Sequence, residues 1–382
     1  MKNFFYFDWR TWWTMVRLVR REQDPARRRR QYRTLCVVVP ALAVLHTVTF
    51  ALDPVFFPAL RRTKVRSPVF VVGHARSGTT YVHRMLANDP RFSYVLLWEM
   101  FFPSLLEKKV LRAVLRWDQR LGGRLRRRID ALDQRLFSKS QSVHESGLFA
   151  PEEDEFLLTM SCASGFWVVQ YPNAQDLDFY YVDDRWPTPK RRRVMQFYKE
   201  CVRRQLVLNG PGLMHLSKAP IHCGRVESLI ETFPDARFVV PVRNPYETIP
   251  SFLKLMQFAW SARKRSEQDM RKSFRSFVDS SYHYYQHPLD VLDAHPEVPS
   301  AIVDYRDLVT NPAGTMLRVY DEIEIGMVAE QEKALAGEKG REYKSGHAYS
   351  LEEFGLDRAE VLDRSAEYLA WAEARCGRSL IG

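Results

Sequence analysis

The stretch Pro68–Met85, PVFVVGHARSGTTYVHRM, restricts the fold of this chain more than any other part of the sequence. Val69–Val72 are consecutive apolar residues and predict a short buried strand, which runs directly into the glycine-bounded loop Gly73–Gly78. From Tyr81 onward, apolar side chains recur at helical spacing. A strand, a glycine-bounded loop and a helix start direct backbone N–H groups and the positive end of a helix at one oxyanion. The stretch therefore predicts a binding site for a phosphate-like group.

The loop differs from a Walker A loop at one position. Gly73 and Gly78 have the Walker spacing, and Thr80 takes the Ser/Thr position. Thr79, however, stands where the lysine belongs, and that lysine reaches the phosphates cleaved in ATP or GTP, so its absence argues against ordinary nucleotide hydrolysis. Arg76 supplies a positive charge from within the loop instead. A purely structural turn between strand and helix is the alternative for this stretch taken alone.

Two motifs resemble those of sulfotransferases that use 3′-phosphoadenosine 5′-phosphosulfate (PAPS). Arg76–Thr80, RSGTT, is similar to the 5′-phosphosulfate loop of that family, in the version with Arg where the cytosolic enzymes usually carry Lys. Arg243-Asn244-Pro245 through Ser251 is similar to the family motif whose Arg and Ser bind the 3′-phosphate. The resemblance implies that the 5′ side of PAPS is bound by Arg76, Ser77, Gly78, Thr79 and Thr80, and the 3′-phosphate by Arg243 and Ser251.

A β/α alternation surrounds the second motif. Residues 213–251 predict strand, helix, strand and helix in turn, which calls for a parallel sheet with right-handed crossovers, and residues 301–309 predict a further strand. Pro241 lies inside one of these strands and has no N–H to donate, so we expect a bulge or a missing hydrogen bond on one side. We predict an α/β fold, a three-layer P-loop-like sandwich around a parallel sheet, over residues 67–382.

Glu99 is the predicted catalytic base. Its position after the loop helix, with Pro103 four residues later, resembles the catalytic glutamate of tyrosylprotein sulfotransferases. A salt-bridged structural carboxylate is the alternative, and His74, His83 and His144 are weaker candidates for the base.

Lys218 is the second catalytic candidate. It ends a predicted strand ahead of x-Pro, like the lysine that stabilises the transition state in the tyrosylprotein enzymes, and with Arg76 it is expected to offset charge on the sulfuryl and leaving groups. No metal is expected in the reaction, because the sequence has no spacing typical of a ligand cluster. The acidic run Glu152–Glu155 suits a helix N-terminus, with a substrate-side role as the alternative. A polar C-terminal loop with His347 and Ser350 is a candidate to close the nucleotide site.

The positive charge of the chain is concentrated in its N-terminal arm. The formal net charge is +11, and residues 1–66 carry 14 Lys and Arg against 4 Asp and Glu. Residues 1–33 mix aromatic residues with arginines, and Leu35–Leu52 follows without a charged side chain. Such a sequence suits a bilayer interface, and the alternative for the aromatic residues is packing on the body of the protein. A nucleic-acid partner is not expected, since no binding module is recognisable.

For Leu35–Leu60 we favour a membrane-associated hairpin that dips in and returns, with a single membrane span and a buried helix as alternatives. The predicted domains are therefore residues 1–66, a membrane-associated arm, and residues 67–382, a sulfotransferase-like domain. Five scattered cysteines without a C-x-x-C pair favour a reduced setting, so we expect the cytoplasmic face of a membrane.

The resemblance implies transfer of a sulfuryl group from PAPS to a hydroxyl of an acceptor, which a membrane-bound arm suggests is a lipid or another amphiphile. A kinase-like phosphotransferase and a membrane-attached, non-catalytic nucleotide-binding protein are the alternatives.

Overall fold

The computed structural model describes residues 4–137, 147–170, 176–261, 267–342 and 351–381. Contacts between residues divide the chain into two compact units. The first comprises Met1–Val65, Ser93–Ser164 and Gln196–His215, and the second comprises Arg66–Phe92, Gly165–Met195 and Leu216–Gly382. The N-terminal arm thus groups with two later segments of the chain, while the division predicted from the sequence, between residues 66 and 67, stays a prediction.

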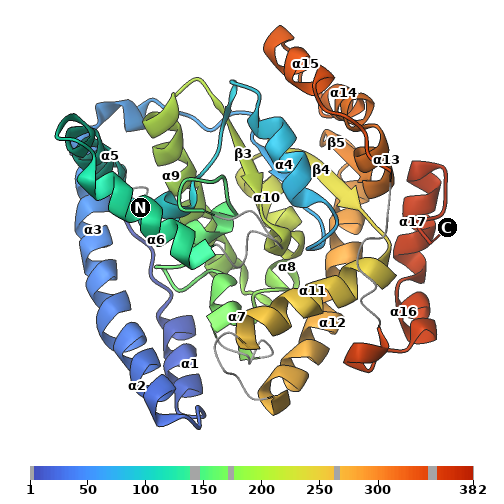
Figure 1. Ribbon diagram of the computed structural model, residues 1–382, viewed down its shortest axis with the longest axis horizontal. Coiled ribbons are helices and arrows are strands. Elements are labelled where there is room, and N and C mark those ends of the chain that lie inside the picture. Colours follow the sequence, from blue (N-terminus) through green and yellow to red (C-terminus); the bar gives the residue numbers. More distant parts are fainter. Residues whose placement is uncertain (1–3, 138–146, 171–175, 262–266, 343–350, 382) are drawn as a thin grey trace. The chain divides into compact units, whose positions relative to one another are not determined.

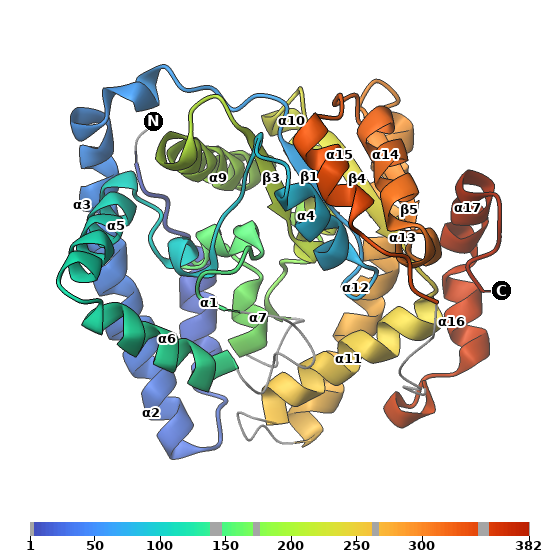
Figure 2. The same cartoon turned by 45° about the horizontal axis from the view of Figure 1, so that its top comes forward.

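A five-stranded sheet has the order β2-β3-β1-β4-β5, of which β3, β1, β4 and β5 can be followed in Figures 1 and 2. β1 pairs in parallel with both β3 and β4, and β4 pairs in parallel with β5. Every residue of β1 is buried, as expected for a strand inside a parallel sheet with both faces covered. The predicted α/β class with a parallel sheet is confirmed. The strands are β1 (Val69–Val71), β2 (Phe92–Ser93), β3 (Met214–Lys218), β4 (Arg237–Val242) and β5 (Ser300–Asp304).

Helices of the second unit cover both faces of its strands. α4 and α15 lie on one face, where Gln331 Nε2 donates to Met85 O at 2.8 Å, and α10 and α12 lie on the other (Figures 1 and 2). α4 follows β1 on the way to β2, whereas α10 and α12 lie in the connections from β3 to β4 and from β4 to β5, which run in the opposite direction along the sheet. Right-handed crossovers in opposite directions place their helices on opposite faces. The helices are α4 (Thr79–Ala87), α7 (Phe166–Gln170), α8 (Val182–Arg185), η6 (Pro220–Arg225), α10 (Val226–Thr232), α11 (Pro245–Ser261), α12 (Glu267–Ala294), α13 (Tyr305–Thr310), α14 (Pro312–Glu322), α15 (Ala329–Ala336), η7 (Glu352–Phe354), α16 (Arg358–Arg364) and α17 (Ala366–Cys376).

Pro241 is accommodated in β4 without a bulge. Its register against Val303 of β5 continues unbroken from the preceding residues. Arg237 donates its backbone N–H to Pro68 O, directly before β1, and Phe238 donates its own to Pro299 O, directly before β5, so alternate residues of β4 face opposite neighbours. Pro241 belongs to the set that faces β1, and β1 has already ended at Val71. The missing N–H is therefore directed at the loop after β1, where no ladder hydrogen bond is required.

The first unit is built from helices. Its elements are α1 (Trp9–Val19), α2 (Pro25–Arg33), η1 (Thr34–Val38), α3 (Val39–Phe56), η2 (Pro58–Arg61), η3 (Leu97–Phe101), α5 (Leu105–Arg120), α6 (Arg124–Phe137), η4 (Asp154–Leu158) and, in part, α9 (Thr188–Asn209). Pro25–Phe56 is one helical run of 32 residues, which by length and composition is sufficient to cross a membrane. A hairpin inside Leu35–Leu60 was therefore the wrong prediction, because this run continues without reversal as far as Phe56.

One predicted strand is shorter than expected. Residues 301–309 were predicted as strand, but β5 ends at Asp304, and α13 begins at Tyr305. The reason is local, because Asp304 caps the helix: its carboxylate accepts a hydrogen bond from Arg306 N at 2.8 Å.

Candidate active site

The loop between β1 and α4 has the backbone of an anion site. Gly78 has a φ of 101°, and Arg76 has a φ of 73°, which costs on the order of 1 kcal/mol for a residue with a side chain. Ser77 N donates to His74 O at 3.1 Å, which closes the turn. The first N–H groups of α4 have no acceptor within the helix and stand at its positive end. The loop therefore places two residues with positive φ at the positive end of the α4 dipole, an arrangement that can bind an anion.

Both glycines of the loop are required by close neighbours. A Cβ on Gly73 would lie 2.9 Å from Pro241 O, so β4 approaches the loop too closely for a side chain. A Cβ on Gly78 would lie 2.6 Å from Cδ2 of Tyr305, in addition to the positive φ. These contacts join the loop to the ends of β4 and β5, where Tyr305 begins α13.

The structure brings the two sequence motifs together. Arg76 Nε donates to Ser251 Oγ at 3.1 Å, and Arg243 Nη1 donates to the backbone oxygen of Arg76 at 3.1 Å. These pairs are separated by 175 and 167 positions in the chain. Ser251 reaches the loop because Asn244 starts α11, its Oδ1 accepting from Tyr246 N at 2.9 Å, and the serine lies two turns further along that helix. Two cationic side chains and a hydroxyl thus lie beside the loop.

Arg243 is fixed on several sides. Its Nε and Nη2 contact Glu247 Oε2 at 2.8 and 2.6 Å, and its guanidinium lies 4.0 Å from the ring centroid of Tyr305. The hydroxyl of Tyr368 accepts from Arg243 N and donates to Arg243 O, both at 3.0 Å. The side chain remains 20% exposed. A partly exposed guanidinium held in one orientation is suited to bind a phosphate group.

His74 is a structural member of the loop. Its Nδ1 donates to Ala75 O at 2.6 Å, and its Nε2 lies 2.8 Å from Ser281 Oγ. Burial lowers the pKa of His74 to about 3, so the imidazole is neutral near pH 7. Both ring nitrogens are engaged, which argues against His74 as the base. His83 is likewise buried on α4, and His144 lies outside the described residues.

Lys218 lies at the same edge of the sheet as the loop. It is the last residue of β3 and is in register with Val71, the last residue of β1. Carboxyl ends of parallel strands meet at one edge, where open α/β sheets bind their ligands. The side chain is 1% exposed, which is unusual for lysine and is typical of a side chain with a specific task or partner.

Glu99 belongs to the first unit and is fully buried in η3. Its Oε1 accepts from Arg112 Nη2 at 2.6 Å, and its Oε2 accepts from Gln205 Nε2 at 2.7 Å and from Leu96 N at 3.1 Å. Gln205 in turn accepts from Lys108 Nζ at 2.7 Å, and burial lowers the pKa of Lys108. The carboxylate is therefore held rigidly, with a guanidinium next to one of its oxygens.

The acidic run Glu152–Glu155 supports local structure. Asp154 Oδ2 accepts from the hydroxyl of Tyr198 and lies 2.8 Å from His215 Nε2. Glu155 Oε2 accepts from Ser164 Oγ at 2.6 Å. These buried contacts agree with the structural interpretation of the run. The other candidate loop, with His347 and Ser350, lies outside the described residues.

Sequence reasoning missed three residues around Arg243. Tyr305 stacks on its guanidinium, Tyr368 bridges its backbone, and Glu247 pairs with its charge. Glu247 is four residues beyond Arg243, in the first turn of α11, and its carboxylate reaches back to the side chain that precedes the helix. No signal in the sequence points to either tyrosine, because each comes from a distant element.

Comparisons with known proteins find similar sequences and similar structures. A family model described as the sulfotransferase family matches residues 68–329, which is more than half of the chain. Two curated relatives, from Mycobacterium bovis and Mycobacterium tuberculosis, are both named omega-hydroxy-beta-dihydromenaquinone-9 sulfotransferase Stf3. Each is 27% identical over 275 residues, a match that covers 68% of this chain and 63% of the relative.

Two solved structures have a similar fold. The crystal structure of sulfotransferase STF9 from Mycobacterium avium has a TM-score of 0.75 at 21% identity, covering 97% of this chain and 93% of the other. The structure of sulfotransferase STF1 from Mycobacterium tuberculosis has a TM-score of 0.61 at 22% identity, covering 85% of each chain.

Proposed function

Because this chain belongs to the sulfotransferase family, as the resemblance at Arg76–Thr80 predicted, we propose that it transfers a sulfuryl group from PAPS to a hydroxyl of a lipid-like acceptor. The two Stf3 relatives are named for a hydroxylated menaquinone derivative, which is a lipid-like alcohol. An acceptor of that chemical class, an apolar molecule with a hydroxyl, is the one we assign to this chain.

The proposal rests on the contacts between the two motifs: Arg76 of the first donates to Ser251 of the second, and Arg243 of the second donates to the backbone oxygen of Arg76. PAPS has a phosphosulfate at its 5′ end and a phosphate at its 3′ position, so its binding needs two anion sites within the length of one nucleotide. Arg76–Thr80 and α4 offer the first, and Arg243 with Ser251 offers the second, linked by hydrogen bonds of 3.1 Å. Thr79 in place of the Walker lysine favours this donor over a nucleoside triphosphate.

The chemistry assigns a role to each candidate residue. Glu99 accepts the proton of the acceptor hydroxyl while the oxygen of that hydroxyl bonds to sulfur. At the same time the bond breaks between sulfur and the oxygen that bridges it to the 5′-phosphate of PAPS. Lys218 and Arg76 offset the charge on the sulfuryl and leaving oxygens, and the products are the sulfate ester, 3′-phosphoadenosine 5′-phosphate (PAP) and a proton. In this role the acceptor hydroxyl takes the place of one of the hydrogen-bond donors to Glu99. Arg112 is the accessible donor among them, with 34% of its side chain exposed.

The exposed face of α3 supports a membrane-bound location. Apolar side chains at helical spacing remain exposed along it, and similar ones line α5, which packs against α3. Exposed arginines flank the stripe, at Arg28–Arg30 before it and at Arg61 and Arg62 after it. An apolar stripe flanked by cations suits the surface of an anionic bilayer. The exposed apolar residues are Val37, Val38, Val44, Leu45, Val48, Leu52, Val55 and Phe56 on the arm, and Val110, Val114 and Trp117 on α5 with Leu121 directly after it.

The opposite face of α3 favours lying on the membrane over crossing it. Asp53 and Arg204 are both fully buried and form an ion pair of 2.7 Å, and Asp53 also accepts from Leu105 N and Leu106 N at the start of α5. His46 Nδ1 lies 2.8 Å from Glu107 Oε1. Charged groups with such partners are costly to move into hydrocarbon. We therefore propose attachment through the exposed face, on the cytoplasmic side expected from the cysteines.

Incubation of the full chain with ³⁵S-labelled PAPS and a total bacterial lipid extract tests the function. Label is expected in an organic-soluble product, together with stoichiometric PAP. Label that appears only in water-soluble products would exclude the lipid-like acceptor. PAP binding without any transfer would favour the non-catalytic nucleotide-binding protein, and transfer of ³²P from γ-labelled ATP with Mg²⁺ would favour the kinase-like alternative.

A further inference from the structure

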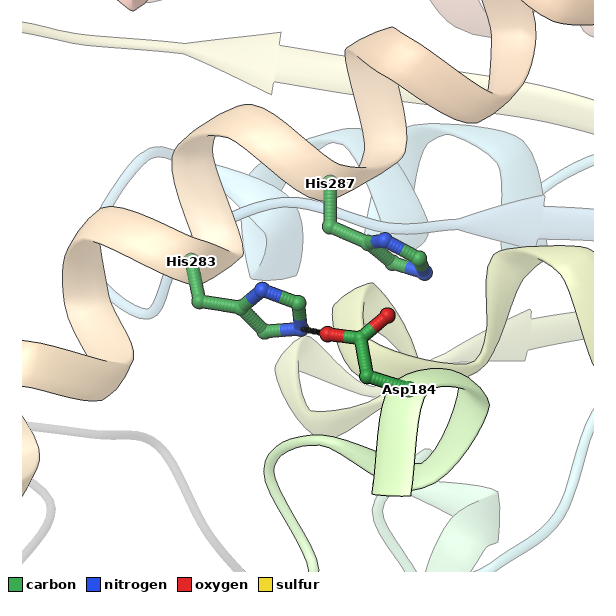
Figure 3. Close-up of side chains that lie close together, drawn as sticks. All are labelled: Asp184, His283 and His287. Carbon is green, nitrogen blue, oxygen red and sulfur yellow. Dashed lines mark ion pairs between the residues drawn. The ribbon is translucent and has the colours of Figure 1, made fainter. Parts of the chain in front are cut away.

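A cluster of two histidines and an aspartate lies away from the two phosphate-binding motifs. Asp184 comes from α8, and His283 and His287 come from successive turns of α12, with their side chains directed at one another (Figure 3). One ligand atom from each residue can be chosen so that all three lie within 4.8 Å of one another. Asp184 is exposed and the histidines are partly buried, so solvent reaches the cluster. It is the one such group that the described part of the chain contains.

The distances resemble those between ligands of one cation. His283 Nε2 and Asp184 Oδ2 are 3.6 Å apart, which is too long for a hydrogen bond. Two ligands of a tetrahedral ion, each about 2.1 Å from it, are separated by about 3.4 Å. The imidazole rings of His283 and His287 stack with centroids 4.8 Å apart, so both present their edges to the same space. All three ligand atoms lie within 4.8 Å of one another.

The donor types also suit a metal. The donor set of two imidazoles and one carboxylate is typical of zinc and of neighbouring divalent transition metals, whereas Mg²⁺ and Ca²⁺ prefer oxygen ligands.

A second carboxylate supports one of the rings. Asp183 Oδ2 lies 3.0 Å from His287 Nε2. Asp183 is itself fixed, because it accepts from Glu227 N at 3.0 Å, from Ser228 N at 3.2 Å and from the Ser228 hydroxyl, and it contacts Arg191 Nη1 at 3.2 Å. Metal-bound histidines commonly have a carboxylate partner of this kind, which orients the ring.

We propose that Asp184, His283 and His287 form a binding site for a divalent transition-metal ion of the zinc type. The three protein ligands leave one coordination position to water. The ion joins α8 to α12, elements separated by about 100 positions in the chain, and thereby stabilises the second unit. The site is independent of sulfuryl transfer, so its failure and the failure of the proposed function are separate results.

Zinc binding to the full chain is the direct test. Tag-free protein is dialysed against a chelator, the chelator is removed, and Zn²⁺ is titrated by calorimetry. We expect one Zn²⁺ per chain, at least tenfold weaker binding for His283→Ala and for Asp184→Asn, and an upward shift of the melting temperature by Zn²⁺ that is lost in both variants. His295→Ala is the matched control, because His295 also contacts carboxylates, at 3.1 Å from Glu227 and Glu297, but lies outside the cluster.

The ligands are identified by substitution with Co²⁺. A tetrahedral site with nitrogen and oxygen ligands gives a visible absorption band, which we expect from the wild type and from His295→Ala but not from His283→Ala. His287→Gln keeps the size of the side chain and serves if the alanine variant does not fold. The proposal is overturned if Zn²⁺ does not bind, or if the double variant Asp184→Asn/His283→Ala binds it as tightly as the wild type.

Discussion

Replacement of Arg243 by alanine tests the proposed 3′-phosphate site. The informative comparison is between PAP and 5′-AMP, which differ by the 3′-phosphate alone. If Arg243 contacts that phosphate, Arg243→Ala weakens the binding of PAP and leaves the binding of 5′-AMP nearly unchanged. If it acts only by packing against Tyr305 and the loop, both ligands lose affinity equally.

The magnitude follows from the surroundings of Arg243. A hydrogen bond to a charged group contributes about 1.5–3 kcal/mol, and about 1.4 kcal/mol is a factor of ten in affinity, so PAP is expected to bind roughly 10- to 100-fold more weakly. Arg243→Ala also leaves the Glu247 carboxylate close to the phosphate without the guanidinium it contacts at 2.6 Å. Their repulsion adds roughly 1 kcal/mol, which the double variant Arg243→Ala/Glu247→Gln recovers as an about fivefold gain in affinity over the single variant.

Isothermal titration calorimetry of both nucleotides measures these changes. Arg237→Ala is the matched control, because Arg237 lies on the same strand, β4, and contacts Ile323 O instead of the loop. It removes the same charge from the opposite end of the strand, so PAP affinity is expected to stay within about twofold of the wild type. Equal losses for PAP and 5′-AMP in Arg243→Ala, or equal losses in Arg237→Ala and Arg243→Ala, would refute the assignment of Arg243.

Three further variants test the other assignments. Glu99→Gln is expected to lower turnover by about 100-fold or more with PAP affinity within about twofold of wild type, whereas unchanged turnover with a lower melting temperature identifies a structural carboxylate. Lys218→Met, which keeps the buried volume, is expected to lower turnover by about 10²–10³ in single-turnover assays, and a rate equal to wild type removes Lys218 from the mechanism. Val44→Asp/Val48→Asp on the exposed face of α3 is expected to weaken binding to phosphatidylglycerol vesicles by at least about tenfold. Leu317→Asp, at a similarly exposed site of the second unit, is the control, and an equal loss there contradicts a specific membrane surface.

The sequence by itself determined the parts of the fold that local rules control. Four consecutive apolar residues followed by a glycine-bounded loop specify β1, the loop and α4, because strand burial and positive φ angles depend on residue type at adjacent positions. The β/α alternation of residues 213–251 predicted a parallel sheet, because a helix between two strands returns the chain to the end of the sheet where the first strand began. Short motifs then predicted membership of the sulfotransferase family, which the family model confirms.

Tertiary structure decided what each candidate side chain contacts. The Leu35–Leu60 stretch has the composition of a re-entrant hairpin, but the structure has one helix as far as Phe56. Asp53 on that helix is buried against Arg204 of α9, a residue 151 positions away in the chain. His283 and His287 lie one turn apart on α12, but Asp184, the third residue of their cluster, is distant in the sequence. Such pairings depend on which elements pack together, and the sequence near each residue carries no record of that.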